Sequence, residues 1–272
     1  MDLHNVQSYL RPRGLDELPS WEKGWAWLAG GTWLFSEAQP HLTTLVDMQQ
    51  MGWDELEERD DGLMIGATCT MSQLLAFESP PHWPGFKSLC RAAHELASFK
   101  IQNVATIAGN VCLALPASTF APVMVLLNAR YQLQTLSGDR RTVAASEFQI
   151  GAKQTVLQPG EVLRLIHIPS EFLEWQVSYR RICVATAGIA VSIVVAARHG
   201  KTGEVRFGIG GCLAVPQLLT FATTPSASEL CEQLDRTISL SSFMDDETAS
   251  ARYRHHVTTV LMERSLHELC SG

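Results

Sequence analysis

Two short turns of small residues are the part of this chain best suited to bind a ligand. The first is Ala29-Gly30-Gly31-Thr32 and the second is Thr106-Ile107-Ala108-Gly109-Asn110, and an apolar segment precedes each. Because such turns carry little side-chain bulk, the phosphates of a ligand can come close to their backbone N–H groups. Two turns of this kind can together hold a diphosphate from both sides.

Each turn also has a plainer interpretation. A glycine pair such as Gly30-Gly31 most often forms a tight turn that contacts no ligand. Residues 106–110 could instead end a helix or join a strand to a helix, since glycine and asparagine are both favoured at helix C-caps. Either turn alone is weak evidence, whereas the pair favours ligand contact.

Other groupings of reactive residues give weaker signals. His255 and His256 are adjacent, so on a helix they point in different directions and are expected at the surface rather than around a metal ion. No Ser-His-Asp, His-Glu-x-x-His or phosphate-loop motif is visible. The tryptophans from Trp21 to Trp33 cluster, which core packing explains as well as stacking on a ligand ring. We therefore expect neither a catalytic residue nor a metal ligand in this chain.

The seven cysteines are scattered along the chain, and none forms a Cys-x-x-Cys pair. Isolated cysteines that are odd in number, in a chain of this length, indicate reduced thiols in a cytoplasmic protein. Iron–sulfur clusters and structural zinc ions need clustered thiolates, so any such centre is expected on another chain.

Length, charge and hydropathy narrow the class of protein further. The chain has 272 residues, 46% of them hydrophobic and 18% charged, which is enough to form a well-buried core. The net charge of −7 argues against a nucleic-acid partner, which normally needs a basic surface. The longest apolar run, residues 182–197, is too short to span a membrane, and no signal peptide is visible.

The predicted elements place both turns between strands and helices. Residues 25–28 form a strand that leads into the first turn, and residues 42–48 form a second strand rich in β-branched side chains. Asp60-Asp61-Gly62 predicts a hairpin, and Thr70 is a candidate N-cap for a helix over residues 72–77. Further along we expect helices at 86–96 and 120–129, and strands at 131–136 and 162–168.

A change of composition at residues 169–175 predicts a domain boundary. Beyond it we expect strands at 176–181, 188–197 and 204–212, followed by helices at 227–234 and 246–268. Strands first and helices last indicate an α+β unit packed against the first part of the chain.

Taken together, these motifs resemble the FAD-binding medium subunit of the molybdenum hydroxylases, the family of xanthine dehydrogenase, carbon monoxide dehydrogenase and their bacterial three-subunit relatives. The matching segments keep the family's order over nearly the whole chain. In that order they are Leu28-Ala29-Gly30-Gly31-Thr32, Leu45-Val46-Asp47, Ile65-Gly66-Ala67-Thr68-Cys69-Thr70, residues 100–110, residues 115–119 with Pro122, Tyr179-Arg180-Arg181 and Ala249-Ser250-Ala251-Arg252-Tyr253-Arg254.

The resemblance implies an α+β protein with two domains. Residues 1–172 would form a two-lobed FAD-binding domain of the PCMH or vanillyl-alcohol-oxidase type, with lobes at about 1–55 and 56–172. Residues 173–272 would form a C-terminal domain with a three-stranded antiparallel sheet and helices.

The resemblance also implies a set of FAD contacts. Both glycine turns would contact the FAD pyrophosphate, Leu163 and Leu96 would lie near the flavin, and Arg180 would place a positive charge beside its ring. The positions that match the family's contacts are Leu28, Ala29, Gly30, Gly31, Thr32, Trp33, Leu34, Leu96, Thr106, Ala108, Gly109, Asn110, Thr119, Leu163 and Arg180.

Several of these positions depart from the family's pattern. Ala108 replaces a glycine and Thr119 replaces an aspartate that would bond the FAD hydroxyls, while Gln102 replaces an arginine. A positive φ angle is unfavourable for alanine, so we expect Ala108 to have ordinary backbone angles or the loop to be shifted.

By resemblance, the chain carries FAD in a multi-subunit molybdenum hydroxylase of the xanthine dehydrogenase type. Electrons would come from a molybdenum-binding subunit through 2Fe–2S centres on a second subunit, and would pass through FAD to NAD+ or another acceptor. Two alternatives stay open: a structural subunit that has weakened or lost FAD binding, and a free-standing flavoprotein oxidase.

Overall fold

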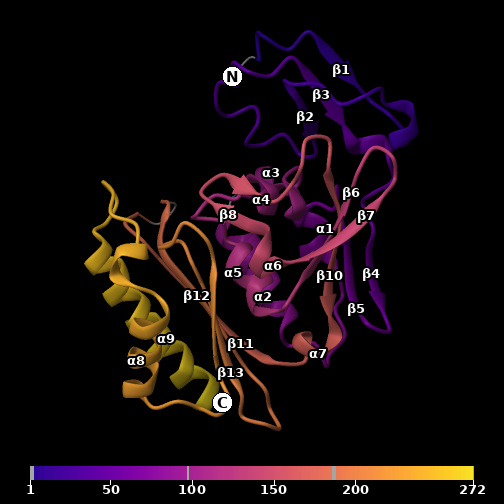
Figure 1. The fold of residues 1–272 in the computed structure, drawn as a ribbon. Coiled ribbons are helices and arrows are strands. Elements are labelled where there is room, and N and C mark those ends of the chain that lie inside the picture. The colour runs from indigo at the N-terminus through magenta and orange to yellow at the C-terminus, as the bar shows by residue number, and fades with distance from the viewer. Residues whose placement is uncertain (1–2, 97, 186–187, 272) are drawn as a thin grey trace.

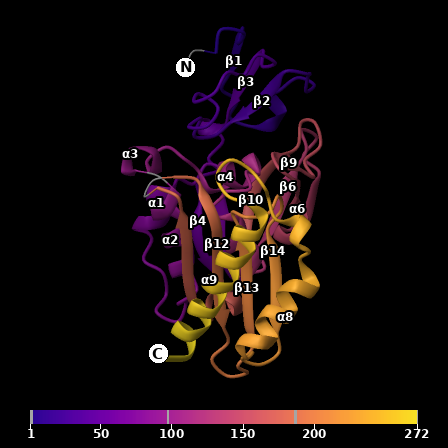
Figure 2. The same cartoon turned by 90° about the vertical axis from the view of Figure 1, so that its left-hand side faces the viewer.

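Successive β-sheets divide the chain into an N-terminal lobe (residues 3–55), a middle lobe (56–175) and a C-terminal layer (176–271), as Figure 1 shows. The computed structural model describes residues 3–96, 98–185 and 188–271. The N-terminal lobe stands above the other two parts in Figures 1 and 2.

The N-terminal lobe is a small parallel sheet with strand order β1-β3-β2. Its own core is a cluster of Leu28, Leu42 and Leu45. The strands predicted before the first turn and at 42–48 are confirmed as β2 and β3. The elements of this lobe are β1 (Ser8–Leu10), the 3-10 helix η1 (Leu15–Glu17), β2 (Trp25–Leu28), β3 (Thr44–Asp47) and the 3-10 helix η2 (Met48–Gln50).

The middle lobe is built on a five-stranded sheet with strand order β4-β5-β10-β6-β7. The central strand β10 runs antiparallel to both of its neighbours. The elements are β4 (Leu56–Arg59), β5 (Gly62–Gly66), α1 (Met71–Ala76), α2 (Phe86–Leu96), α3 (Phe99–Gln102), α4 (Ile107–Leu113), α5 (Ala121–Leu126), β6 (Arg130–Gln134), β7 (Arg140–Ala144), α6 (Ala145–Phe148), β8 (Gln149–Gly151), β9 (Gln154–Thr155), β10 (Val162–Pro169) and α7 (Ser170–Leu173).

Local signals in this lobe act as the sequence predicts. Strands β4 and β5 pair as a hairpin, with Arg59 opposite Gly62. The Thr70 side chain accepts from the backbone N–H of Gln73 at 3.2 Å, and the Gln73 side chain bonds back, which completes a capping box at the start of α1.

The C-terminal layer has a four-stranded antiparallel sheet, where three strands are predicted. Its order is β11-β12-β13-β14. The additional strand β14 pairs only with β13, so this short segment after Pro216 owes its form to ladder hydrogen bonds and not to a strong local pattern. The elements are β11 (Gln176–Cys183), β12 (Ala190–Arg198), β13 (Val205–Gly210), β14 (Gln217–Phe221), α8 (Ala227–Thr237), the 3-10 helix η3 (Leu240–Ser242) and α9 (Ala251–Ser271).

Helix α9 begins later than the predicted start at residue 246. The Asp246 carboxylate accepts from the backbone N–H groups of Thr248 and Ala249 at 2.8 and 3.2 Å, which holds this segment in a turn before the helix.

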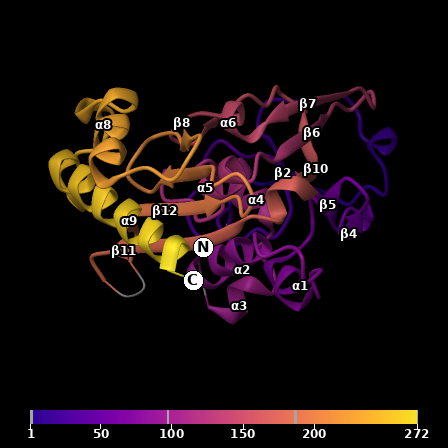
Figure 3. The same cartoon turned by 90° about the horizontal axis from the view of Figure 1, so that it is seen from below.

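The C-terminal sheet packs on both of its faces. Along β12, Ile193 and Val195 join the core of the middle lobe, while Val194 and Ala196 face a second core shared with α8 and α9. In Figure 3, α9 lies along one face of this sheet and α5 lies on the other. Gly208 permits the close approach of α5, since a Cβ there would lie 2.1 Å from the carbonyl oxygen of Pro122.

Arg254 joins α9 to the sheet from a fully buried position. Its guanidinium donates to the carbonyl oxygens of Val191 and Gly211 at 2.7 and 3.0 Å, and to both carboxylate oxygens of Asp246 at 2.8 and 2.9 Å. Only 1% of its surface is exposed. Because a planar guanidinium satisfies several acceptors at once, this residue compensates its own burial.

Replacing this side chain should destabilise the C-terminal layer. We expect Arg254→Met to lower the free energy of unfolding by about 3 kcal/mol, because it leaves buried carbonyl oxygens without donors. Urea unfolding followed by circular dichroism measures the change. Arg252→Met, on the exposed face of the same helix, is the matched control, and equal stability of the two variants would contradict this assignment.

Stability should also depend on pH through Asp246. Burial pushes the pKa of this carboxyl upwards, but hydrogen bonds from Arg254 and two backbone N–H groups outweigh burial and hold the pKa below its ordinary value. The carboxylate therefore stabilises the fold at neutral pH, and this contribution is lost as the pH falls through the lowered pKa. Asp246→Asn should be less stable than the unmodified chain at pH 7, and the difference should shrink in acid. A difference that is constant from pH 7 to pH 3 would contradict this.

Candidate functional site

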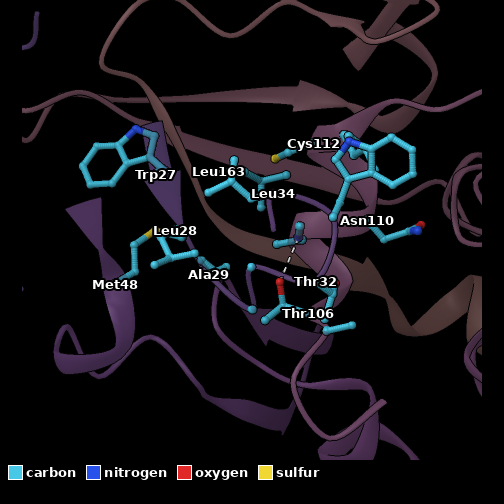
Figure 4. Close-up of a pocket in the computed structure, with 18 of the residues that line it drawn as sticks. Trp27, Leu28, Ala29, Thr32, Leu34, Met48, Thr106, Asn110, Cys112 and Leu163 are labelled. Atoms are coloured by element: carbon cyan, nitrogen blue, oxygen red, sulfur yellow. Dashed lines mark hydrogen bonds between the residues drawn. The ribbon is translucent and has the colours of Figure 1, made fainter. Parts of the chain in front are cut away.

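A cavity of about 560 Å³ opens between the N-terminal and middle lobes, as Figure 4 shows in close-up. This volume lies within the range of roughly 300–1,000 Å³ that is usual for small-molecule and cofactor sites. The lining consists of residues 27–34, parts of 105–115, parts of 157–163, and the single residues Met48, Ala67, Met71, Leu96 and Ile101.

The structure brings nearly all of the predicted contact residues to this cavity. Every residue from Leu28 to Leu34 lines it, as do Leu96 and Leu163 and, from the second turn, Thr106, Ala108, Gly109 and Asn110. The two glycine turns, far apart in the sequence, therefore border one site.

Thr119 and Arg180 are the two predicted contact residues that do not line the cavity. Thr119 is buried, and its hydroxyl has no hydrogen-bond partner among the described residues. Arg180 donates instead to the Glu268 carboxylate of α9 at 2.7 Å. The sequence shows only that Arg180 follows Tyr179, and this local pattern does not reveal Glu268 as its partner.

The first turn lies directly against the backbone that precedes the second. A Cβ at Gly30 would lie 2.0 Å from the carbonyl oxygen of Val104 and 3.0 Å from the Cα of Ala105. Gly31 has a φ of +67°, and a Cβ there would meet the ring of Phe35 at 2.6 Å. Both glycines are therefore required, one for close approach and one for backbone conformation.

The backbone of the first turn offers free donors to the cavity. Among the described residues, none of the N–H groups of residues 30–34 has an acceptor in the protein. Five successive amides beside a cavity can bind anionic oxygen atoms, because backbone N–H groups in a turn form concave anion sites.

The second turn is the N-terminal turn of helix α4, and because helix α3 precedes it, the interpretation as a strand-to-helix connection is wrong and the turn joins two helices. Thr106 is the N-cap, and its hydroxyl accepts from the Gly109 N–H at 3.0 Å, the dashed line in Figure 4. Ala108 lies inside the helix and is not among the described residues with a positive φ. The alanine thus fits without a shift of the loop.

The side chains around the cavity are mostly apolar. Glu161 is the one charged residue among the described lining residues. Arg141 donates to both of its carboxylate oxygens at 2.7 Å, and this hydrogen bonding holds the pKa of Glu161 below its ordinary value. Burial raises the pKa of the Cys112 thiol to about 12, so this lining thiol stays protonated at neutral pH.

Several lining residues were not predicted from the sequence. Trp27, Met48 and Met71 are ordinary apolar residues in strands or helices, and Glu161 follows a Pro-Gly turn. Nothing in the local sequence distinguishes these side chains from core or surface residues, because their place at the cavity follows from how the two lobes pack.

Within the described residues, no group of three or more His, Cys, Asp or Glu side chains is arranged to hold a metal ion. In the same part of the chain, no helix combines the length and the apolar character that a membrane span requires.

Comparison with known proteins shows the family of this chain. The sequence model of the family described as "FAD binding domain in molybdopterin dehydrogenase" matches residues 4–171. The xanthine dehydrogenase/oxidase of Gallus gallus is 28% identical over 173 residues, which cover 57% of this chain but only 12% of that protein. This chain therefore corresponds to a small part of the xanthine dehydrogenase.

Two further proteins match over most of the chain. The nicotine 6-hydroxylase medium subunit of Paenarthrobacter nicotinovorans is 26% identical over 239 residues, covering 85% of this chain and 83% of that protein. Quinoline 2-oxidoreductase from Pseudomonas putida 86 superposes with a TM-score of 0.82 at 18% identity, covering 100% of this chain and 99% of the other. At this identity, the superposition shows a shared fold.

The contact between the two turns gives a direct test of the site. We expect Gly30→Ala to destabilise the chain by about 2 kcal/mol through overpacking against Val104, and to lower FAD content about tenfold or more, because the N–H groups of the first turn move out of place. Absorbance and FAD released on denaturation measure both. Gly200→Ala, where a Cβ meets open space, is the matched control, and normal FAD content in Gly30→Ala would contradict the prediction.

Proposed function

This chain belongs to the family of FAD-binding domains of the molybdopterin dehydrogenases, and from that premise we propose that it binds FAD in the cavity between its N-terminal and middle lobes. The observation that carries the proposal is the run of backbone N–H groups at residues 30–34, which have no acceptor in the described protein and lie beside the cavity. A dinucleotide diphosphate requires donors of this kind, while its rings require apolar walls.

The residues present fit FAD in two respects. The amides of residues 30–34 have no acceptor in the described protein and lie beside a cavity of suitable volume. The close approach of Gly30 to Val104 leaves no side chain between the two turns. We assign the diphosphate to the 28–34 and 106–110 segments, and the rings to the apolar walls that include Leu96 and Leu163.

FAD supplies the redox chemistry by accepting electrons and passing them on, and the protein supplies binding and orientation. The lining side chains that could carry a proton are not suited to do so. Arg141 holds Glu161 ionised, and Cys112 stays protonated at neutral pH. We therefore assign no general acid or base to the described residues of the cavity.

We propose further that the chain is the FAD-carrying subunit of a multi-subunit molybdenum hydroxylase of the xanthine dehydrogenase type. A molybdenum-binding subunit and a subunit with 2Fe–2S centres would supply electrons, and NAD+ or another acceptor would receive them. The similar protein of Paenarthrobacter nicotinovorans is itself a medium subunit. Residues 1–172 would form the FAD-binding domain and residues 173–272 the C-terminal domain.

An exposed apolar surface beside the cavity is an argument for a partner chain that binds there. Phe99, Ile101 and Val104 on and after α3 are 67%, 39% and 47% exposed, and Ile101 also lines the cavity. A partner seated on this surface would cover the edge of the site and exclude water from it. We propose the iron–sulfur subunit as that partner, since electron transfer to FAD needs the two centres close together.

The alternative of a structural subunit without FAD has one observation in its favour. Among the described residues the Thr119 hydroxyl is buried without a hydrogen-bond partner, at a position where the family resemblance implies an aspartate. Of the two other departures behind this alternative, Ala108 fits its helical position without a positive φ, and Gln102 is buried with its side-chain amide donating to the carbonyl oxygen of Ala93 at 3.2 Å. We also place the protein in the cytoplasm, because all seven cysteines are free thiols, the state that a reducing compartment maintains.

Purification from the native host, with an affinity tag on this chain, tests the proposal. We expect two further chains to copurify, one with iron and sulfide and one with molybdenum, and about one FAD per copy of this chain after denaturation. Partners without FAD would establish the structural subunit instead. FAD without partners, together with oxidase activity, would establish the free-standing flavoprotein.

A further inference from the structure

Residues 149–161, which run from β8 to the start of β10, contact the N-terminal lobe. The Trp27 indole N–H donates to the carbonyl oxygen of Glu161 at 3.0 Å. A Cβ at Gly160 would lie 3.0 Å from the side chain of Trp21, so this turn packs on an indole without a gap. The segment therefore borders the cavity and fixes part of the N-terminal lobe.

Lys153 occupies a special backbone position within this segment. Its φ is +56°, and in the described part of the chain only Ala114 and Asn128 are other non-glycine residues with a positive φ. The Lys153 N–H donates to the carbonyl oxygen of Ala114 at 2.8 Å, and Ala114 ends helix α4. Two strained residues thus brace each other at the far end of the helix whose first turn lines the cavity.

The side chain of Lys153 crosses to the other lobe. Its Nζ lies 5.1 Å from the centroid of the Trp33 ring and 3.6 Å from a carboxylate oxygen of Glu37. Trp33 directly follows the first turn and lines the cavity. Lys153 therefore connects the end of α4 directly to the turn that carries the free N–H groups.

A lysine in this conformation needs an explanation, because glycine adopts a positive φ at lower cost. The side-chain contacts across the lobes supply one. We propose that Lys153 is a positioning residue, which holds Trp33 and the first turn against the middle lobe and so slows the release of FAD. This inference rests on the proposed binding of FAD in the cavity.

The size of the effect follows from the two contacts. An exposed cation–π contact and an exposed ion pair each favour the closed position of the first turn over the open one by roughly two- to fivefold in the equilibrium constant. Their loss should favour opening of the first turn and so raise the rate of FAD release by about five- to tenfold. The ion-pair part should weaken at high salt, because salt screens exposed charges.

The test compares four variants in the purified FAD-loaded protein, one of them the conservative replacement Lys153→Arg. Lys153→Gly removes the side chain and relieves the backbone, Lys153→Met keeps the alkyl stem without the charge, and Asn128→Gly relieves the same kind of backbone strain away from the cavity. FAD release is followed by the rise of flavin fluorescence after dilution. Hydrogen exchange of residues 29–37 is measured on protein stripped of FAD.

We expect Lys153→Gly to release FAD about five- to tenfold faster, with a melting temperature of the FAD-free protein equal to or above that of the unmodified chain. Asn128→Gly should share the effect on melting temperature without faster release. Lys153→Met should release FAD faster and lose the salt dependence of release, while Lys153→Arg should restore slow release. Amides of residues 29–37 should exchange faster in the glycine and methionine variants.

Two results would overturn the inference: unchanged release in both Lys153→Gly and Lys153→Met, or equally fast release in Asn128→Gly. Faster release together with unchanged exchange of residues 29–37 would also overturn it, because the first turn would then not be the element that Lys153 holds. Failure of the proposed function is separate, since the unmodified protein would then carry no FAD, and unchanged exchange in the FAD-free variants would still reject the role of Lys153.

Discussion

The backbone-to-backbone contact between Gly30 and Val104 is the constraint on which the site depends. A Cβ at residue 30 would lie 2.0 Å from a carbonyl oxygen, so no other residue fits without moving one lobe away from the other. The N-terminal lobe has a small core of its own, built around Leu28, Leu42 and Leu45. Its position therefore depends on contacts across the cavity. The cavity and the placement of this lobe are two results of the same close approach.

The site combines apolar walls with neutral donors and holds little free charge. Its one charged lining residue in the described chain, Glu161, is neutralised by two hydrogen bonds from Arg141. The free N–H groups of residues 30–34 can bind an anionic diphosphate without a buried cation. Backbone dipoles are already oriented before the ligand arrives, so binding does not require long side chains to lose conformational freedom. The Lys153 ammonium lies over the Trp33 ring, and Lys153 is not among the described residues that line the cavity.

In the C-terminal layer, too, a glycine allows two backbone segments to come into close contact. Gly208 lets the start of α5 lie against β13, and Arg254 satisfies carbonyl oxygens between the sheet and α9. The two faces of β12 thereby belong to two different cores. The middle lobe rests on this sheet, which keeps α4 and its first turn in place below the N-terminal lobe.

By itself, the sequence determined the features that depend on neighbours along the chain. It predicted the glycine turns, the strands before and after the first of them, the β4–β5 hairpin and the cap at Thr70, because turn and cap preferences act over a few residues. It was also enough to identify the family, because several motifs in the same order along the chain can be recognised even where overall identity is low. The tertiary structure alone decided which distant groups meet. Arg180 pairs with Glu268, 88 residues away, Glu161 and Trp27 meet at the cavity, and the edge strand β14 forms on β13. Such pairings follow from how sheets and lobes pack. A local pattern of residue types does not show which distant residue will become the partner.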